Sequence, residues 1–146
     1  MERRKFIKTC CYTAAGIPMM ASVLQSCGAI HYASFSRDAN KLTLPKSEFL
    51  KIFKEKKTER NFVLITTNDS EFPICVYKVE EDKYIASLLK CTHRGCELNV
   101  GGGIYTCPCH GSEFTTTGKV LEGPADQDLK TFIIETDNEN IYITLS

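Results

Sequence analysis

Two short segments, Cys91-Thr-His93-Arg-Gly-Cys96 and Cys107-Pro-Cys109-His110-Gly-Ser112, decide the fold and chemistry of this chain. Each segment offers one thiolate, one imidazole and one further cysteine. An ordinary 2Fe-2S cluster takes four thiolates, but in one variant two histidines replace two cysteines on one of the two irons. The two segments therefore indicate an iron-sulfur cluster held by two cysteines and two histidines.

The pair of segments resembles the cluster-binding loops of Rieske iron-sulfur proteins, over about residues 88 to 125. The match is to the subgroup with a disulfide between the loops, as in the Rieske subunits of quinol-cytochrome c reductases and the small subunit of arsenite oxidase. The resemblance implies one Rieske-type [2Fe-2S] cluster. It implies that Cys91 and Cys107 bind the inner iron and that His93 and His110 bind the outer one.

Further roles follow from the same resemblance. It implies a disulfide between Cys96 and Cys109, and a hydrogen bond from Ser112 to a cluster sulfur. Gly123-Pro124-Ala125 resembles the proline loop that covers the cluster from a third side.

Three positions depart from the quinol-oxidising members of the family. Arg94 replaces the usual leucine, Phe114 stands where many members have tyrosine, and Asp126 stands where many have proline. Arg94 and Asp126 weaken the case for a standard quinol site. If Phe114 occupies the place of a hydroxyl donor, we expect Phe114→Tyr to raise the reduction potential.

Two alternatives to the cluster remain open from the residues alone. A set of two cysteines and two histidines also binds tetrahedral zinc, usually with the two cysteines first and the two histidines after them. Here each segment mixes the two residue types, and zinc would leave one cysteine in each segment unused. A disulfide framework without metal would leave both histidines unexplained.

The N-terminus has the order of regions typical of an export signal. Arg3-Arg4-Lys5 resembles a twin-arginine signal, an apolar run extends from about Cys10 to Leu24, and Leu24-Gln-Ser-Cys27 resembles a lipoprotein cleavage box. We therefore expect a signal peptide over 1–26, lipidation of Cys27, a tether over 27–40 and the Rieske domain over 41–146. The alternatives are a general secretory signal and an uncleaved anchor, but the apolar run is shorter than the roughly 20 residues that span a bilayer.

Composition agrees with one small domain. Removal of 1–26 leaves 120 of the 146 residues, with 14 Lys and Arg against 17 Asp and Glu, since 1–26 holds four basic and one acidic residue. This mild acidity gives no reason to expect nucleic acid or an anionic membrane surface as a partner.

Short apolar runs with period-two alternation predict strands over 62–66, 74–79, 84–88, 131–135 and 141–145. We therefore expect an all-β domain, and the resemblance implies an antiparallel β-sheet sandwich with a small cluster-binding subdomain. Residues 47–57 fit a short amphipathic helix about as well as a strand. Their lysines and Arg60 form a basic group, which we interpret as a solvated face, with a docking site as the alternative.

The ligand set predicts one-electron transfer at the outer face of a bacterial membrane, with the protein exported and anchored by lipid. The expected partner is a redox protein such as a cytochrome. The alternative is a quinol-oxidising subunit of a bc-type complex, and less favoured is the small subunit of a molybdenum oxidoreductase. Imidazole ligands with exposed ring nitrogens would couple electron uptake to proton uptake.

Overall fold

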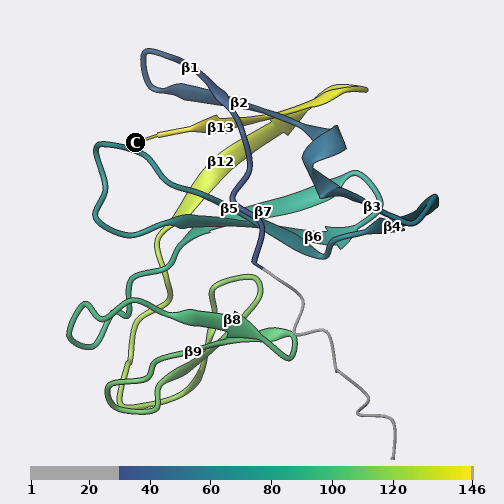
Figure 1. The fold of residues 1–146 in the computed structure, drawn as a ribbon. Helices are drawn as coiled ribbons and strands as arrows, with labels where there is room; N and C mark the ends of the chain where they lie inside the picture. Colours follow the sequence, from purple (N-terminus) through teal and green to yellow (C-terminus); the bar gives the residue numbers. More distant parts are fainter. Residues whose placement is uncertain (1–29, 146) are drawn as a thin grey trace, which may run out of the picture.

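The computed structural model describes residues 30–145, and its regular structure in this range is almost entirely antiparallel β (Figure 1). This confirms the all-β fold class. The main sheet has the order β1-β2-β13-β12-β7-β6-β5. Its strands are β1 (Ser36–Asp38), β2 (Lys41–Pro45), β5 (Phe62–Ile65), β6 (Ile74–Glu80), β7 (Lys83–Leu88), β12 (Thr131–Thr136) and β13 (Asn140–Thr144).

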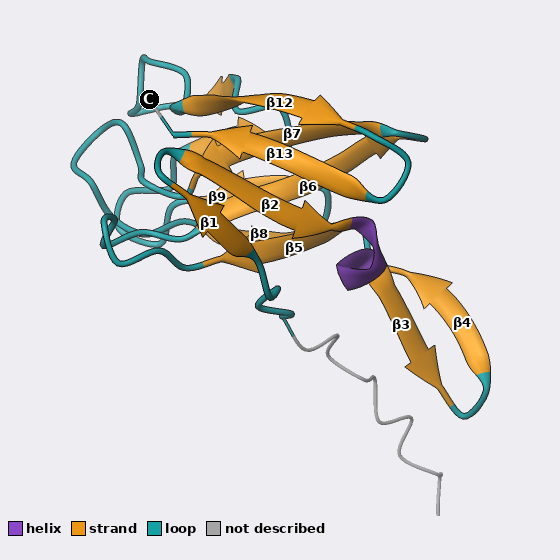
Figure 2. Ribbon diagram, turned by 90° about the horizontal axis from the view of Figure 1, so that it is seen from above, coloured by secondary structure: helices purple, strands orange, loops and turns teal. Residues whose placement is uncertain are grey.

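The chain just before β1 closes this sheet. The Ala33 N–H donates to the Leu64 carbonyl at 2.8 Å, and the Leu64 N–H donates to the His31 carbonyl at 2.9 Å. Because β1 and β5 are the two edges of the sheet, these bonds join its ends. Figures 1 and 2 show the chain just before β1 passing beside β5. Buried side chains of the sheet, of the segment before β1 and of the short helix after β2 form the main core: Ala33, Leu42, Leu44, Phe49, Val63, Ile65, Ile74, Val76, Ala86, Ile141 and Ile143.

Part of the expected tether lies within the described residues. Ala33 is buried in the core, Phe35 packs against it, and β1 begins at Ser36. Part of the expected tether therefore belongs to the folded domain, through Ala33, Phe35 and β1. The expected signal over 1–26 and the lipidation of Cys27 lie outside the described residues.

The five strands predicted from alternation all form, as β5, β6, β7, β12 and β13, with bounds within one residue of the expected ones. An aspartate closes the turn between β12 and β13. The Asp137 carboxylate accepts hydrogen bonds from the N–H groups of Glu139 at 2.8 Å and Asn140 at 2.6 Å. An aspartate that satisfies its own turn in this way favours a tight hairpin.

A second, smaller sheet is inserted between β7 and β12. It consists of β8 (Asn99–Gly101), β9 (Ile104–Thr106), β10 (Glu113–Thr115) and β11 (Val120–Glu122), in the order β11-β10-β9-β8. The chain leaves the main sheet after Leu88 and returns at Thr131, which pairs with Ser87, so the insertion begins and ends at one place. Figure 1 shows it as the lower lobe.

Residues 46–59 differ from both simple expectations. They form a 3-10 helix, η1 (Lys46–Phe49), followed by the hairpin of β3 (Leu50–Phe53) and β4 (Lys56–Glu59). The turn residues Lys54 and Glu55 both have positive φ, 45° and 66°, as in the tight turns that suit two-residue hairpins. Phe49 is buried at 2% exposure and joins the core, whereas the strands that follow extend away from it.

Candidate metal centre

The two segments fold into loops with the same backbone hydrogen bonds. In the first loop, the Cys91 N–H donates to the Cys96 carbonyl and the Gly95 N–H donates to the Cys91 carbonyl, both at 2.8 Å. In the second, the Cys107 N–H donates to the Ser112 carbonyl at 2.8 Å and the Gly111 N–H donates to the Cys107 carbonyl at 3.0 Å. The loops 91–96 and 107–112 are therefore built alike, each starting from a cysteine.

Glycine closes each loop at the equivalent place. Gly95 has φ 77° and Gly111 has φ 79°, a left-handed conformation that glycine adopts without the steric penalty of a side chain. The shared backbone places His93 two residues after Cys91, and His110 three residues after Cys107. The structure thus brings both histidines onto the loop tips, at non-equivalent positions.

The cysteines that start the loops are buried together. Cys91 is 2% exposed and Cys107 is 3% exposed, and both are free thiols. Burial opposes ionisation of the Cys107 thiol, but the N–H groups of Cys109 and His110 and the Cys91 thiol outweigh it and lower its pKa. Thiolates are the form that ligates metal, so this surrounding favours ligation at Cys107.

The two histidines of the loops face each other. Their ring centroids lie 4.9 Å apart with the rings almost perpendicular, at 87°. His93 is half-buried, and its Nδ1 is a buried nitrogen without a hydrogen-bond partner among the described residues. Since buried polar atoms are nearly always bonded, an unpartnered ring nitrogen is what a metal ligand requires. His110 is exposed.

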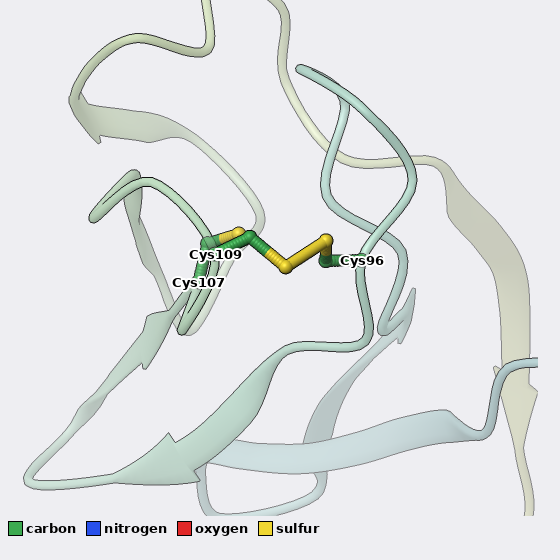
Figure 3. Close-up of side chains that lie close together, drawn as sticks. All are labelled: Cys96, Cys107 and Cys109. Atoms are coloured by element: carbon green, nitrogen blue, oxygen red, sulfur yellow. A yellow bond between two sulfur atoms is a disulfide. The ribbon is translucent and has the colours of Figure 1, made fainter.

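The remaining pair of cysteines joins the two loops. Cys96 and Cys109 form a disulfide with Cα atoms 6.5 Å apart, which confirms the bond that the resemblance implies. Figure 3 shows that Cys107 lies next to this bond, and the three sulfurs fall within 4.8 Å of one another. Sulfurs already bonded to each other offer no thiolate, so this trio is not a ligand set, and only Cys107 of the three is available to a metal.

A third loop, over 123–127, is held by both cluster loops. The Ala125 N–H donates to the buried Ser112 Oγ at 3.0 Å, and the Thr92 hydroxyl donates to the Gln127 carbonyl at 2.7 Å. The Gly123–Pro124 peptide bond is cis. The Ala125 and Thr92 contacts carried no signal in the sequence, because each joins residues far apart along the chain. The proline motif did identify the loop itself.

The three positions that depart from the quinol-oxidising pattern have different surroundings. Arg94 and Asp126 are both exposed, so each adds a charge to the surface near the loops. Phe114 is fully buried, in a second core cluster that also contains Cys91 and Cys107. Residues 30–145 contain no helix long and apolar enough to cross a membrane.

The donor set fits a Rieske cluster better than tetrahedral zinc. The two loops of equal design supply two buried thiols and two facing imidazoles, and the other cysteine of each loop is used in the disulfide rather than left idle.

Comparisons with known proteins give the same family. The model of the Rieske [2Fe-2S] domain matches residues 49–133. The cytochrome b6-f complex iron-sulfur subunits of Synechococcus sp. (strain RCC307) and Prochlorococcus marinus (strain MIT 9303) are each 41% identical over 56 residues. In each case the match covers 37% of this chain and 32% of the relative, so the chain spans about a third of the length of these relatives.

A comparison with solved structures gives the same family. The cyanobacterial plasma membrane Rieske protein PetC3 from Synechocystis PCC 6803 is 36% identical, with a TM-score of 0.51, over 57% of this chain and 86% of that one. The family implies one Rieske-type [2Fe-2S] cluster and electron transport. The chain belongs to the Rieske [2Fe-2S] domain family.

Proposed function

We propose that this protein carries single electrons at the outer face of a bacterial membrane, with Cys91 and Cys107 on the inner iron and His93 and His110 on the outer iron. The observation that carries the proposal is that two loops of the same backbone design together supply two buried free thiols and two facing imidazoles, whose ring centroids lie 4.9 Å apart. When bound, the cluster supplies a one-electron couple, in the window of roughly −150 to +300 mV for histidine-ligated centres.

The two kinds of ligand differ in their exposure to solvent and to a redox partner. Cys91 and Cys107 lie inside a buried cluster of apolar side chains, which excludes water from their side of the site. The exposed His110, on the other side, offers a redox partner the shortest route to the metal. Because an electron crosses a short gap most readily, we infer that partners dock over the loop tips.

The disulfide and the third loop fix the geometry between these two sides. The bond between Cys96 and Cys109 ties the loop tips, and Ser112 and Thr92 hold the loop over 123–127 against them. Ligands held in this way need little rearrangement when the charge of the centre changes. That is the property expected of an electron carrier.

The second candidate is a quinol-oxidising subunit of a bc-type complex. Identity to cytochrome b6-f iron-sulfur subunits favours it, although that identity is confined to 56 residues. Against it stand the exposed charges of Arg94 and Asp126, where an apolar docking tip would be needed. The small subunit of a molybdenum oxidoreductase is less favoured. Of these functions, one-electron transfer is therefore the one we propose first, with a redox protein such as a cytochrome as the expected partner.

Location at the membrane rests on the sequence. The twin-arginine pattern suits a protein that must cross the membrane folded with its cluster, and Cys27 would carry the lipid anchor. Outside the cytoplasm a disulfide such as Cys96–Cys109 persists, whereas cytoplasmic reductants oppose it. Its presence beside the ligands therefore supports export.

Metal analysis and EPR of the purified protein test the proposal. We expect two irons and two acid-labile sulfides per chain, and a rhombic signal of low average g value after reduction. His110→Ala should abolish this signal. Arg94→Ala, in the equivalent position of the other loop, should keep it. One zinc per chain without the signal, or equal loss in both variants, would contradict the ligand assignment.

A further inference from the structure

The β3–β4 hairpin carries exposed apolar and basic side chains together at its tip. Ile52 is 69% exposed and Phe53 is 65% exposed, both large apolar residues. Lys54, Lys56 and Lys57 are exposed as well, and none of them takes part in an ion pair within residues 30–145. Lys54 Nζ lies 5.6 Å from the centre of the Phe53 ring, a contact within the tip itself. Glu55 of the turn is exposed too, so the tip offers a partner apolar surface and a net positive charge of three lysines against one glutamate.

The base of the hairpin, by contrast, is fixed to the domain. The Arg60 N–H donates to the Phe49 carbonyl at 2.7 Å, and its guanidinium donates to the carbonyls of Glu48 and Leu50. Glu59 pairs with Lys78 of β6 at 2.7 Å. Arg60 and Glu59 at the base are used in these contacts, whereas the three lysines of the tip are not.

The strand register shows why this tip does not suit a flat apolar partner. Ile52 stands opposite Lys57, and Phe53 stands opposite Lys56. Directly opposed residues lie on the same face of an antiparallel pair, so each face presents one apolar side chain beside one lysine. Docking either face on an apolar protein surface would bury a lysine, and would leave the apolar residue of the other face in water.

The interface of a bilayer can contact both faces of the hairpin at once. It closes around a protruding tip, takes apolar side chains at the boundary of the acyl chains, and lets lysines extend to the phosphates. Clustered basic residues bind anionic lipids in particular. The mild acidity of residues 27–146, which gives no reason to expect an anionic partner, is a total, whereas at this tip basic residues outnumber acidic ones.

The position of the hairpin agrees with this partner. Figures 1 and 2 show it projecting from the body of the molecule, away from the lobe of β8 and β9. A redox partner bound there would be distant from the cluster loops. Ile30, the first described residue, is 51% exposed and lines a surface pocket together with Lys51 and Thr58 of the hairpin. The chain therefore enters the domain beside the hairpin.

We propose that the tip of the β3–β4 hairpin docks on an anionic membrane surface, with Ile52 and Phe53 in the interface and Lys54, Lys56 and Lys57 on lipid phosphates. This contact goes beyond electron transfer and does not depend on the cluster. It would hold the domain with the hairpin toward the lipid, and so define its orientation at the membrane.

Tryptophan fluorescence of the full chain tests the contact, because the sequence contains no tryptophan. The variant Phe53→Trp reports from the tip. Ile133→Trp, at a β12 position 66% exposed, is the matched control. The vesicles contain brominated phosphatidylcholine, either alone or mixed with brominated phosphatidylglycerol. Lys54→Glu, Lys56→Glu and Lys57→Glu are combined in the Phe53→Trp background, and far-ultraviolet circular dichroism checks that each variant folds.

We expect Phe53→Trp emission to shift to shorter wavelength and to be quenched severalfold more in phosphatidylglycerol vesicles than in phosphatidylcholine alone. The lysine variant should lose this difference, and Ile133→Trp should show none. Quenching equal at the two tryptophan positions, or independent of phosphatidylglycerol, would overturn the proposal. A shift that instead grows with protein concentration without vesicles would assign the tip to a second copy of the chain, and would overturn it too.

Discussion

Ser112 serves two neighbours with one hydroxyl group. Its Oγ accepts the Ala125 N–H at 3.0 Å, which leaves its own proton free to donate. The side chain is fully buried among the residues that line the site. One residue can therefore hold the third loop and, as the family resemblance implies, donate to a cluster sulfur.

Ser112→Ala should change both properties together. Loss of the donor should lower the reduction potential by roughly 40 mV for each 1 kcal/mol of hydrogen bond to the reduced centre. Loss of the acceptor leaves the Ala125 N–H unpaired, which should lower the free energy of unfolding by about 1–3 kcal/mol. Voltammetry and denaturant unfolding measure the two effects. Thr92→Val removes the other tie to the third loop and should leave the potential nearly unchanged; an unaltered potential in Ser112→Ala would contradict the donor role.

Cys75 makes the stability of the domain sensitive to alkaline pH. Burial raises its pKa from 9.0 to about 12, despite a hydrogen bond with Tyr105. Below pH 9 both folded and unfolded chains keep the proton, so the benefit of burying a neutral thiol is complete. Between pH 9 and about 12 only the unfolded chain releases it, so the free energy of unfolding should fall as pH rises.

Chemical denaturation between pH 7 and 11 checks the Cys75 prediction. Cys75→Ala removes the titrating group, so its free energy of unfolding should decline less steeply above pH 9 than that of the parent protein. If the free energy of unfolding declined equally steeply above pH 9 in both proteins, the Cys75 thiol would not be the cause of the pH dependence.

At the scale of elements, the inserted lobe meets the main sheet at Gly118. This residue is buried, has φ 83°, and donates its N–H to the Thr115 carbonyl at 2.9 Å. A Cβ there would lie 3.3 Å from Thr131 Cγ2 and 3.4 Å from Ser87 Oγ, two residues that pair between β12 and β7. The turn of the lobe thus packs directly on the strands from which the lobe emerges.

Gly118→Ala should destabilise the protein more than Gly103→Ala. Both residues have positive φ, 83° and 81°, so alanine costs about 1–2 kcal/mol of backbone strain at either place. Only at position 118 does the new methyl group also meet neighbours, since position 103 is open. Thermal unfolding of the two variants isolates the packing contribution. A smaller effect at 118 than at 103 would mean that the lobe adjusts freely.

At the scale of the whole molecule, the two cores divide the chain into a scaffold and a site. The main core draws only on residues outside the insertion 89–130, whereas the second core combines Leu64 and Cys75 of the sheet with residues of the insertion. The scaffold can therefore keep its packing when the site changes.

Removal of the metal should loosen the site and leave the scaffold intact. Hydrogen exchange of the cluster-free protein should show lost protection at the loops 91–96, 107–112 and 123–127. Amides of β6, β7 and β13 should stay protected, because their buried side chains belong to the main core. The cluster-loaded protein is the reference. Loss of protection in β6 to the same extent as in the loops would show that the cluster holds the whole fold.

The sequence by itself determined what depends on neighbouring residues. Period-two alternation located β5, β6, β7, β12 and β13, because alternate side chains of a strand face opposite sides of the sheet. The two loop motifs indicated the donor types and the family, because ligand type and spacing are local properties.

Only the tertiary structure decided what depends on distant partners. Strands β8 to β11 have three residues each, too few to show a period. The apolar pattern of Phe49, Leu50, Ile52 and Phe53 fits a helix or a strand. In the folded protein Phe49 is buried in the core, whereas the hairpin that follows lies outside it. Closure of the sheet by residues 31–33, and the tie between Ser112 and Ala125, join segments whose sequences carry no mutual signal. Backbone and hydroxyl groups find such partners by proximity in the folded chain, so the amino-acid types alone do not reveal them.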